Sequence, residues 1–208
     1  MIKPMGSEHP KTARTDHDVI DLIARRWSPR AFDSTKDVTR AELLRLFEAA
    51  RWAPSGQNEQ PWRFVVILRH ESPAAFEALL TALLPKNRSW AEAAPVLVLV
   101  VVDETRKYGP SAGAWYDAGQ AVAFLTLQAT AMELSVRQME GFVAAAAREA
   151  CHVPASFTPA VIMAIGYAGD PDALPHESHR VAERQPRTRR PLSEFVFDTE
   201  WGKTFREK

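Results

Sequence analysis

The sequence predicts a single domain of the α/β or α+β class, in which about four strands are interleaved with helices. The chain has 208 residues, which is long enough for one domain with a substantial core. Short β-branched runs alternate with segments of helical periodicity. No internal repeat, Gly/Ser linker or low-complexity tract divides the chain.

The first part of the chain is expected to form a polar arm followed by a helix. Residues 1–16 contain no apolar segment of the kind that a secretory signal needs, so we expect a flexible N-terminal arm. Residues 18–26 then carry apolar side chains at helical spacing, and Thr15 or Asp16 is placed to cap that helix. Residues 17–208 are expected to form the domain.

A second helix leads into a loop that is unusually rich in polar side chains. Thr39 and Glu42 form a capping-box pattern, and an apolar helix face continues from there to Arg51. A turn needs only one or two special residues, which Pro54 and Gly56 supply. The further hydrogen-bonding groups point to a ligand, although such a stretch taken alone is more often an ordinary loop, so the rest of the chain must decide. They are Ser55, Gln57, Asn58 and Gln60.

The remaining elements follow from periodicity. The segment 112–134 is apolar around most of its circumference, so it should be a central helix or one buried against another subunit; its polar residues disfavour a membrane span. The tail from residue 170 contains Phe195 and Phe197, which a partner subunit could bury. Besides this helix we expect strands at 64–68, 96–102, 136–139 and 160–165 and a helix at 73–84.

Composition excludes several classes of function. Lys plus Arg and Asp plus Glu are both 26, so no overall field recruits nucleic acid or an anionic membrane. The single cysteine, Cys151, fits a reducing cytoplasm, and it is better read as a buried thiol than as a nucleophile paired with His152. His176 and His179 lack a zinc-binding context, so no metal is expected. P-loop, dinucleotide-binding GxGxxG and GxSxG patterns are missing.

Two basic clusters, residues 25–30 and 187–190, are separated by most of the chain. Each cluster alone is more often a solvated face. Arginine offers paired donors that match phosphate oxygens, so the two clusters together could hold a terminal phosphate if the fold brings them into contact. A third feature, Glu140-Gly141-Phe142, follows a strand; its glycine permits close approach of a ligand, and a plain turn is the alternative.

Four segments occur in one order along the chain: RWSPR at 26–30, APSGQNEQPW at 53–62, EGF at 140–142 and RTRRPL at 187–192. In this combination the chain resembles the FMN-dependent nitroreductase family over about residues 17–198. The resemblance implies a three-layer α-β-α sandwich with a central mixed sheet of about four to five strands and a domain-swapped C-terminal arm. It also implies a homodimer with FMN at the subunit interface, whereas the cytoplasmic location that we expect rests on the single cysteine and the polar N-terminal segment.

The activity that the resemblance implies is an NAD(P)H-dependent, ping-pong oxidoreductase. Hydride passes from NAD(P)H to flavin N5 and then to an electron-poor acceptor such as a nitroaromatic or quinone. Open alternatives are another flavin reaction on the same fold (dehalogenation, flavin cleavage or heterocycle dehydrogenation), a non-catalytic flavin-binding protein, and a structural dimerisation module without flavin. The physiological acceptor and the choice between NADH and NADPH do not follow from the sequence.

The resemblance assigns the basic clusters to the flavin. Arg26 and Ser28 are expected at the FMN phosphate and ribityl chain, and Arg187 and Arg189 at the phosphate. Arg30 falls where the family places a cation near flavin N1 and O2, which favours the reduced flavin. Trp27 lies inside this motif, where many relatives have a smaller residue, and is included in the cofactor site.

The resemblance also assigns the polar loop and the strand end. Loop residues of the second subunit are expected to contact the flavin ring and ribityl hydroxyls. The end of the 136–139 strand is expected near flavin N5, where a backbone N–H approaches and no catalytic side chain is certain. The loop residues are Pro54, Ser55, Asn58 and Gln60, and the strand-end residues are Met139, Glu140 and Gly141.

The chain departs from the family in the short link 103–113, where larger members insert a helical excursion that covers the substrate. The substrate lid must therefore be built differently. Candidate lid residues, for which core or surface packing is the alternative, are Trp90, Lys107, Tyr108 and Trp115. The helix through Asp117, Gly119 and Gln120 is expected at the dimer interface.

Overall fold

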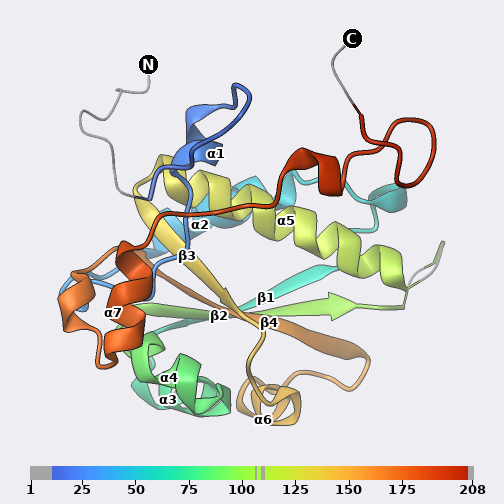
Figure 1. The fold of residues 1–208 in the computed structure, drawn as a ribbon. Coiled ribbons are helices and arrows are strands. Elements are labelled where there is room, and N and C mark those ends of the chain that lie inside the picture. The colour runs from blue at the N-terminus through green and yellow to red at the C-terminus, as the bar shows by residue number, and fades with distance from the viewer. Residues whose placement is uncertain (1–10, 106, 109–110, 206–208) are drawn as a thin grey trace.

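A four-stranded sheet with strand order β1-β2-β4-β3 forms the centre of the computed structural model, which describes residues 11–105, 107–108 and 111–205 (Figure 1). Every pair of neighbouring strands is antiparallel, so the expected mixed sheet is wrong for these strands. The crossover after β2 makes β3 parallel to β2, but β4 inserts between them and runs the opposite way. The strands are β1 (Trp62–Leu68), β2 (Val96–Asp103), β3 (Leu134–Met139) and β4 (Phe157–Tyr167).

Helices cover both faces of the sheet, as Figure 1 shows, which confirms the three-layer arrangement. β2 explains why a strand can be apolar throughout, because its side chains alternate between two cores. Val98 and Val100 belong to the core beneath α2 and α5, whereas Leu97 and Leu99 belong to the core on the side of α3, α4 and α6. The helices are α1 (Asp21–Arg25), α2 (Arg40–Arg51), α3 (Pro73–Ala82), α4 (Pro85–Ala91), α5 (Ala112–Ala131), α6 (Ala144–Ala150) and α7 (Glu177–Arg184), with 3-10 turns at Gly56–Asn58, Pro171–Ala173 and Leu192–Glu194.

Helix ends account for most differences from the expected elements. α1 begins at Asp21 after Ile20, without a side-chain cap, so capping by Thr15 or Asp16 is wrong. The helix expected at 73–84 ends at Ala82 because Pro85 disfavours helical backbone in the residue before it, and α4 starts at that proline. α4, α6 and α7 were not expected from the sequence.

α2 begins with the capping box that the sequence predicts. The Glu42 N–H donates to Thr39 Oγ1 at 3.2 Å, and the Thr39 N–H donates to Glu42 Oε2 at 2.8 Å. Tyr167 at the end of β4 donates its hydroxyl to Glu42 Oε1 at 2.7 Å, so the cap also ties α2 to the sheet.

Replacing Thr39 with Ala is expected to lower the free energy of unfolding by about 1 kcal/mol, measured by urea denaturation, since one cap is lost. Thr39→Ser is the control. The Thr39 donors hold the pKa of the Glu42 carboxyl below its ordinary 4.5. The stability that the ionised Glu42 carboxylate gains from these hydrogen bonds is therefore fully present above pH 4.5. It is lost as the pH falls through the lower pKa of Glu42 in the folded state. A Thr39→Ala variant as stable as Thr39→Ser at pH 7 would contradict this role.

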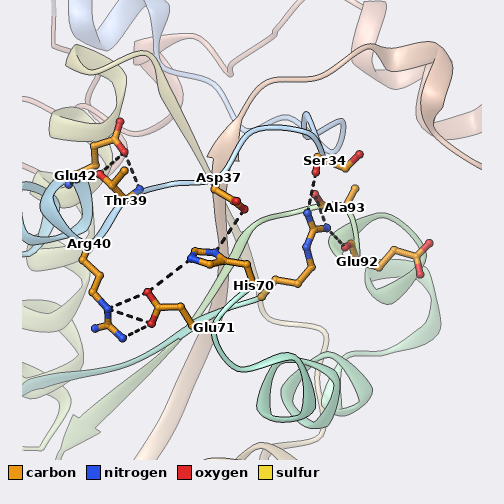
Figure 2. Close-up of polar contacts among 10 residues, drawn as sticks. Ser34, Asp37, Thr39, Arg40, Glu42, His70, Glu71, Glu92 and Ala93 are labelled. Carbon is orange, nitrogen blue, oxygen red and sulfur yellow. Dashed lines mark hydrogen bonds and ion pairs between the residues drawn. The ribbon is translucent and has the colours of Figure 1, made fainter.

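Polar contacts fix the path of the chain between the Arg26–Arg30 segment and α2 (Figure 2). Arg40 pairs with Glu71. His70 lies between two carboxylates, with Nδ1 at 3.5 Å from Asp37 and Nε2 at 3.7 Å from Glu71. Such exposed pairs each contribute little to stability. Arg69 adds hydrogen bonds to the carbonyl oxygens of Ser34, Glu92 and Ala93.

None of the helices in the described part of the chain is long and apolar enough to cross a membrane. Cys151 is a free, half-buried thiol, and burial raises its pKa, which disfavours the reactive thiolate. Within the described residues no group of three or more His, Cys, Asp or Glu side chains is placed to hold a metal ion.

Candidate functional site

The two basic clusters meet in the fold. A pocket of about 690 Å³ is lined by Arg26 at the end of α1 and by Arg187, Arg189 and Arg190 after α7. Arg26 Nη1 donates to Ser28 Oγ at 3.1 Å. Two segments more than 150 residues apart therefore present guanidinium groups to one pocket.

The arginines of this pocket repel one another. Burial lowers the pKa of Arg26, and the charge of Arg189 lowers it further. Burial likewise lowers the pKa of Arg187, followed by the charges of Arg26 and Arg189. Arginine still remains protonated at neutral pH, so the cations stay in place at an electrostatic cost. A bound anion would relieve this repulsion, which fits the terminal phosphate of a cofactor.

Hydrogen bonds hold Arg187 within the pocket. Its Nη1 donates to the carbonyl oxygens of Lys11 at 2.9 Å and Ala24 at 2.8 Å. Arg187 therefore joins the segment after α7 to the N-terminal segment and to α1. The Lys11 ammonium lies 5.4 Å from the centroid of the Trp27 ring, and Trp27 lines a second pocket together with Arg26.

The segment that carries Ser28 and Arg30 continues along the end of β4. The Asp33 N–H donates to Tyr167 O at 3.0 Å, and the Gly169 N–H donates to Ala31 O at 2.9 Å. A Cβ on Gly169 would lie 2.5 Å from the Phe32 carbonyl carbon, so only glycine permits this approach. The position of Arg30 is thereby fixed by the sheet.

Arg30 is paired with a carboxylate that sequence reasoning missed. Its Nη1 lies 3.4 Å from Glu183 Oε1, and its backbone N–H donates to Glu183 Oε2 at 3.1 Å. The neighbouring Arg137 donates to Ser28 O and stacks over the Trp90 ring at 5.2 Å. Burial lowers the pKa of Arg137 to about 10. Nothing in the local sequence of α7 links Glu183 to Arg30.

The polar loop after α2 is held in an uncommon conformation. Gln57, Asn58 and Gln60 have φ values of 53°, 56° and 47°. Backbone strain of this kind in non-glycine residues persists only where surrounding contacts enforce it, and it is concentrated at functional sites. Here Gln60 Nε2 donates to Asn58 Oδ1 at 3.0 Å, and the Gln60 N–H donates to Ser55 Oγ at 3.2 Å. Pro54 is exposed beside them.

One chain does not bring this loop to the arginine pocket. The Gly56 N–H donates to Asp117 Oδ2 at 3.1 Å, which places the loop at the beginning of α5. Arg26 lies near Thr130 at the end of α5, since both line a second pocket. At about 1.5 Å per residue, Asp117 and Thr130 are separated by roughly 20 Å along the helix.

The strand end after β3 offers a backbone donor. The Gly141 N–H donates to no acceptor among the described residues, whereas its carbonyl oxygen accepts from the Leu84 N–H at 3.0 Å and from Asn87 Nδ2 at 3.2 Å. A Cβ on Gly141 would lie 2.8 Å from Asn87 Nδ2, so close packing on α4 also favours glycine here. Met139 is buried and Glu140 is exposed.

The lid candidates separate into core and surface residues. Trp90 is 2% exposed and stands in the core, so its assignment to the lid is wrong. Lys107 and Tyr108 donate their backbone N–H groups to Glu59 Oε1 at 2.9 and 3.0 Å, which ties the short link to the polar loop. Trp115 is exposed on α5.

Apolar side chains remain uncovered on the outer surface of the chain. In Figure 1 the segment after α7 passes across α5 toward the C-terminus. Phe195 in that segment is 57% exposed, and the ring centroids of Phe197 and Trp201 lie 4.9 Å apart. On α5, Tyr116 and Phe124 are also exposed. Burial of Phe195 by a partner subunit stays a prediction, as does the domain-swapped arm.

Comparison with known proteins identifies the family. A model of the nitroreductase family matches residues 23–167. A solved "oxidoreductase containing FMN" has a TM-score of 0.84 and 29% identity and covers 96% of this chain and 100% of its own. A 15.4 kDa protein of Mycolicibacterium smegmatis is 34% identical over 123 residues, which is 59% of this chain and 82% of that protein.

A shorter match involves an oxygen-insensitive NAD(P)H nitroreductase of Enterobacter cloacae, which is 35% identical over 57 residues, or 27% of this chain and 26% of that enzyme. The family match is far longer and contains the whole sheet together with the Arg26–Arg30 segment. The three-layer fold and the order of the motifs agree with it. The chain therefore belongs to the nitroreductase family.

Proposed function

We propose that this protein binds FMN and transfers two electrons, as hydride, from NAD(P)H to an electron-poor acceptor such as a nitroaromatic or a quinone. The observation that carries the proposal is the convergence of Arg26, Arg187 and Arg189 on one pocket within a nitroreductase-family fold. A solved relative is described as containing FMN, and the Enterobacter cloacae relative as using NAD(P)H. When bound, FMN would supply the redox chemistry.

The phosphate of FMN would occupy the arginine pocket. Arg26 and Arg189 repel each other there, and a dianionic phosphate supplies the missing negative charge. Ser28 adds a hydroxyl beside Arg26. Arg187 already donates to two carbonyl oxygens through Nη1, so it would contribute its charge and its remaining donors.

Arg30 and Gly141 would contact the flavin ring. The Arg30 side chain is 22% exposed, so its guanidinium reaches the surface beside a buried carboxylate. A cation there would favour the reduced form of the flavin, which carries additional negative charge. The Gly141 N–H, which meets no acceptor among the described residues, would donate a hydrogen bond toward flavin N5, so that a backbone group rather than a side chain contacts this atom.

The complete site would be shared between two copies of the chain. Antiparallel pairing of two α5 helices about a two-fold axis would bring the polar loop of one copy to the arginine pocket of the other. The exposed α5 residues Tyr116 and Phe124, with Gly119 between them, offer a surface for such pairing. Pro54, Ser55, Asn58 and Gln60 would then contact the flavin from the partner chain. Sedimentation of a flavin-loaded monomer would contradict this arrangement.

The test is the visible spectrum of the purified protein under anaerobic conditions. We expect a yellow protein that bleaches with NADPH or NADH and regains its colour with a nitroaromatic or quinone. The control is free FMN at the same concentration, which separates protein-bound reduction from the slow reaction in solution. A protein that stays colourless with excess FMN would refute the proposal. Bound FMN that neither nicotinamide reduces would favour the non-catalytic flavin-binding alternative.

A further inference from the structure

A buried carboxylate on α7 contacts Arg30, one of the candidate site residues. The Glu183 side chain is 1% exposed, although burial of an unpaired carboxylate is costly. Its two oxygens contact Arg30 at different atoms: Oε2 accepts the backbone N–H and Oε1 pairs with Nη1. One carboxylate thus fixes both the main chain and the guanidinium of Arg30.

The end of α7 that presents Glu183 is itself held by Lys11. The Lys11 ammonium donates to the carbonyl oxygens of Ala182 at 2.8 Å and Gln185 at 2.5 Å, on either side of Glu183. Burial lowers the pKa of the Lys11 ammonium, and the charge of Glu183 opposes this shift. The carboxylate is therefore kept in place from both sides, by Arg30 and by the helix end that Lys11 secures.

Cations otherwise dominate this part of the molecule. Arg137 is close enough for Arg30 to lower its pKa and for Glu183 to raise it. His179, one turn before Glu183 on α7, is buried, and its Nδ1 has no hydrogen-bond partner among the described residues. Glu183 thus offsets part of a positive charge to which Arg30, Arg137 and Lys11 all contribute.

We propose that Glu183 is a positioning residue of the flavin site, which orients Arg30 and offsets its charge, and so limits how strongly the site prefers reduced over oxidised FMN. This inference rests on the proposed function. The geometry that supports it is independent of the cofactor: the carboxylate is buried, it contacts Arg30 twice, and only the Arg30 side chain reaches the surface. Replacing the carboxylate by an amide removes the negative charge and keeps one of the two acceptor oxygens, so one contact with Arg30 can persist while its charge is no longer offset.

The substitution that achieves this is Glu183→Gln. An uncompensated cation near the flavin strengthens the binding of the more negative, reduced form. We expect the ratio of the FMN dissociation constants, oxidised over reduced, to rise about tenfold, which is a positive shift of about 30 mV in the two-electron midpoint potential. Glu177→Gln on the exposed face of the same helix is the matched control and should leave the potential unchanged.

The measurements are the FMN dissociation constant from fluorescence quenching and the midpoint potential against a reference dye. Circular dichroism and urea unfolding check that each variant is folded. A second variant, Arg30→Gln, should shift the potential in the negative direction. In the Arg30→Gln background, Glu183→Gln should have a smaller effect, because the part that depends on the position and charge of Arg30 is lost.

The possible failures are distinguishable. Wild-type protein that binds no FMN would refute the proposed function, on which this inference depends. Wild-type protein that binds FMN and has the same potential as Glu183→Gln would overturn the role of Glu183 alone. A shift that persists in full without Arg30 would overturn its action through Arg30. Should Glu183→Gln fail to fold, an unchanged potential in Arg30→Gln would overturn the inference.

Discussion

Alanine at Arg26 or at Arg189 is expected to weaken FMN binding by roughly 10- to 100-fold, since hydrogen bonds to charged groups contribute about 1.5–3 kcal/mol each. The two residues come from opposite ends of the chain and meet in one pocket. The double variant should lose more than either single variant. The measurement is the dissociation constant of FMN from fluorescence quenching.

Arg25→Ala is the matched control for Arg26→Ala. Arg25 is the last residue of α1, directly before Arg26. It pairs with Asp21 one turn earlier and is not among the residues that line the arginine pocket. Its loss should leave FMN affinity within about twofold of wild type, which is less than 0.5 kcal/mol. The free energy of unfolding of the apoprotein is a second measurement. Arg26→Ala removes the charge repulsion between Arg26 and Arg189, so this variant should not lose stability for that reason. Undiminished FMN affinity in both Arg26→Ala and Arg189→Ala would exclude their phosphate role.

Gly169→Ala is expected to lower the free energy of unfolding by about 1–3 kcal/mol and to weaken FMN binding as well. The new Cβ would lie 2.5 Å from the carbonyl carbon and 2.6 Å from the oxygen of Phe32. Backbone atoms cannot move aside as a side-chain end can, so the segment that carries Ser28 and Arg30 must shift away from β4. Urea denaturation and FMN titration measure the two effects.

The control for Gly169→Ala is Ala168→Ser at the neighbouring exposed position, which should change stability by no more than about 0.5 kcal/mol. If both variants were as stable as wild type and bound FMN equally well, the close approach of Gly169 to Phe32 would not matter for the site. If Gly169→Ala lowered the free energy of unfolding but left FMN affinity unchanged, the segment that carries Ser28 and Arg30 would keep its position relative to the cofactor despite the clash.

Local sequence patterns predicted the elements whose causes are local. The Thr39–Glu42 cap involves groups within one helical turn, so both partners are visible in the sequence. The unbroken apolar run of β2 indicates a strand covered on both faces, which the two cores on either side of it explain. The order of the arginine, amide-loop and glycine motifs along the chain likewise indicates the family, which the family match confirms.

Some parts of the structure could not be predicted from local sequence patterns, because the residues that contact each other there are far apart in the chain. Trp90 is a candidate lid residue from the sequence, with core packing among the alternatives, and the core that includes α4 buries it. The unusual φ values of the polar loop depend on contacts such as that between Gly56 and Asp117, 61 positions away. β4 inserts between β2 and β3 and pairs antiparallel with both, and no strand pattern specifies this order.

The sequence by itself determined the composition of the candidate site: the arginines, the amide loop and the glycine after β3 are all readable from it. Only the tertiary structure decided how these groups are placed and what holds them. Arg187 reaches the pocket of Arg26 because α7 returns the chain to α1, and Arg30 meets Glu183 across 153 positions. Charge pairs at such separation depend on the path of the whole chain, whereas periodicity and capping report only interactions within a few residues.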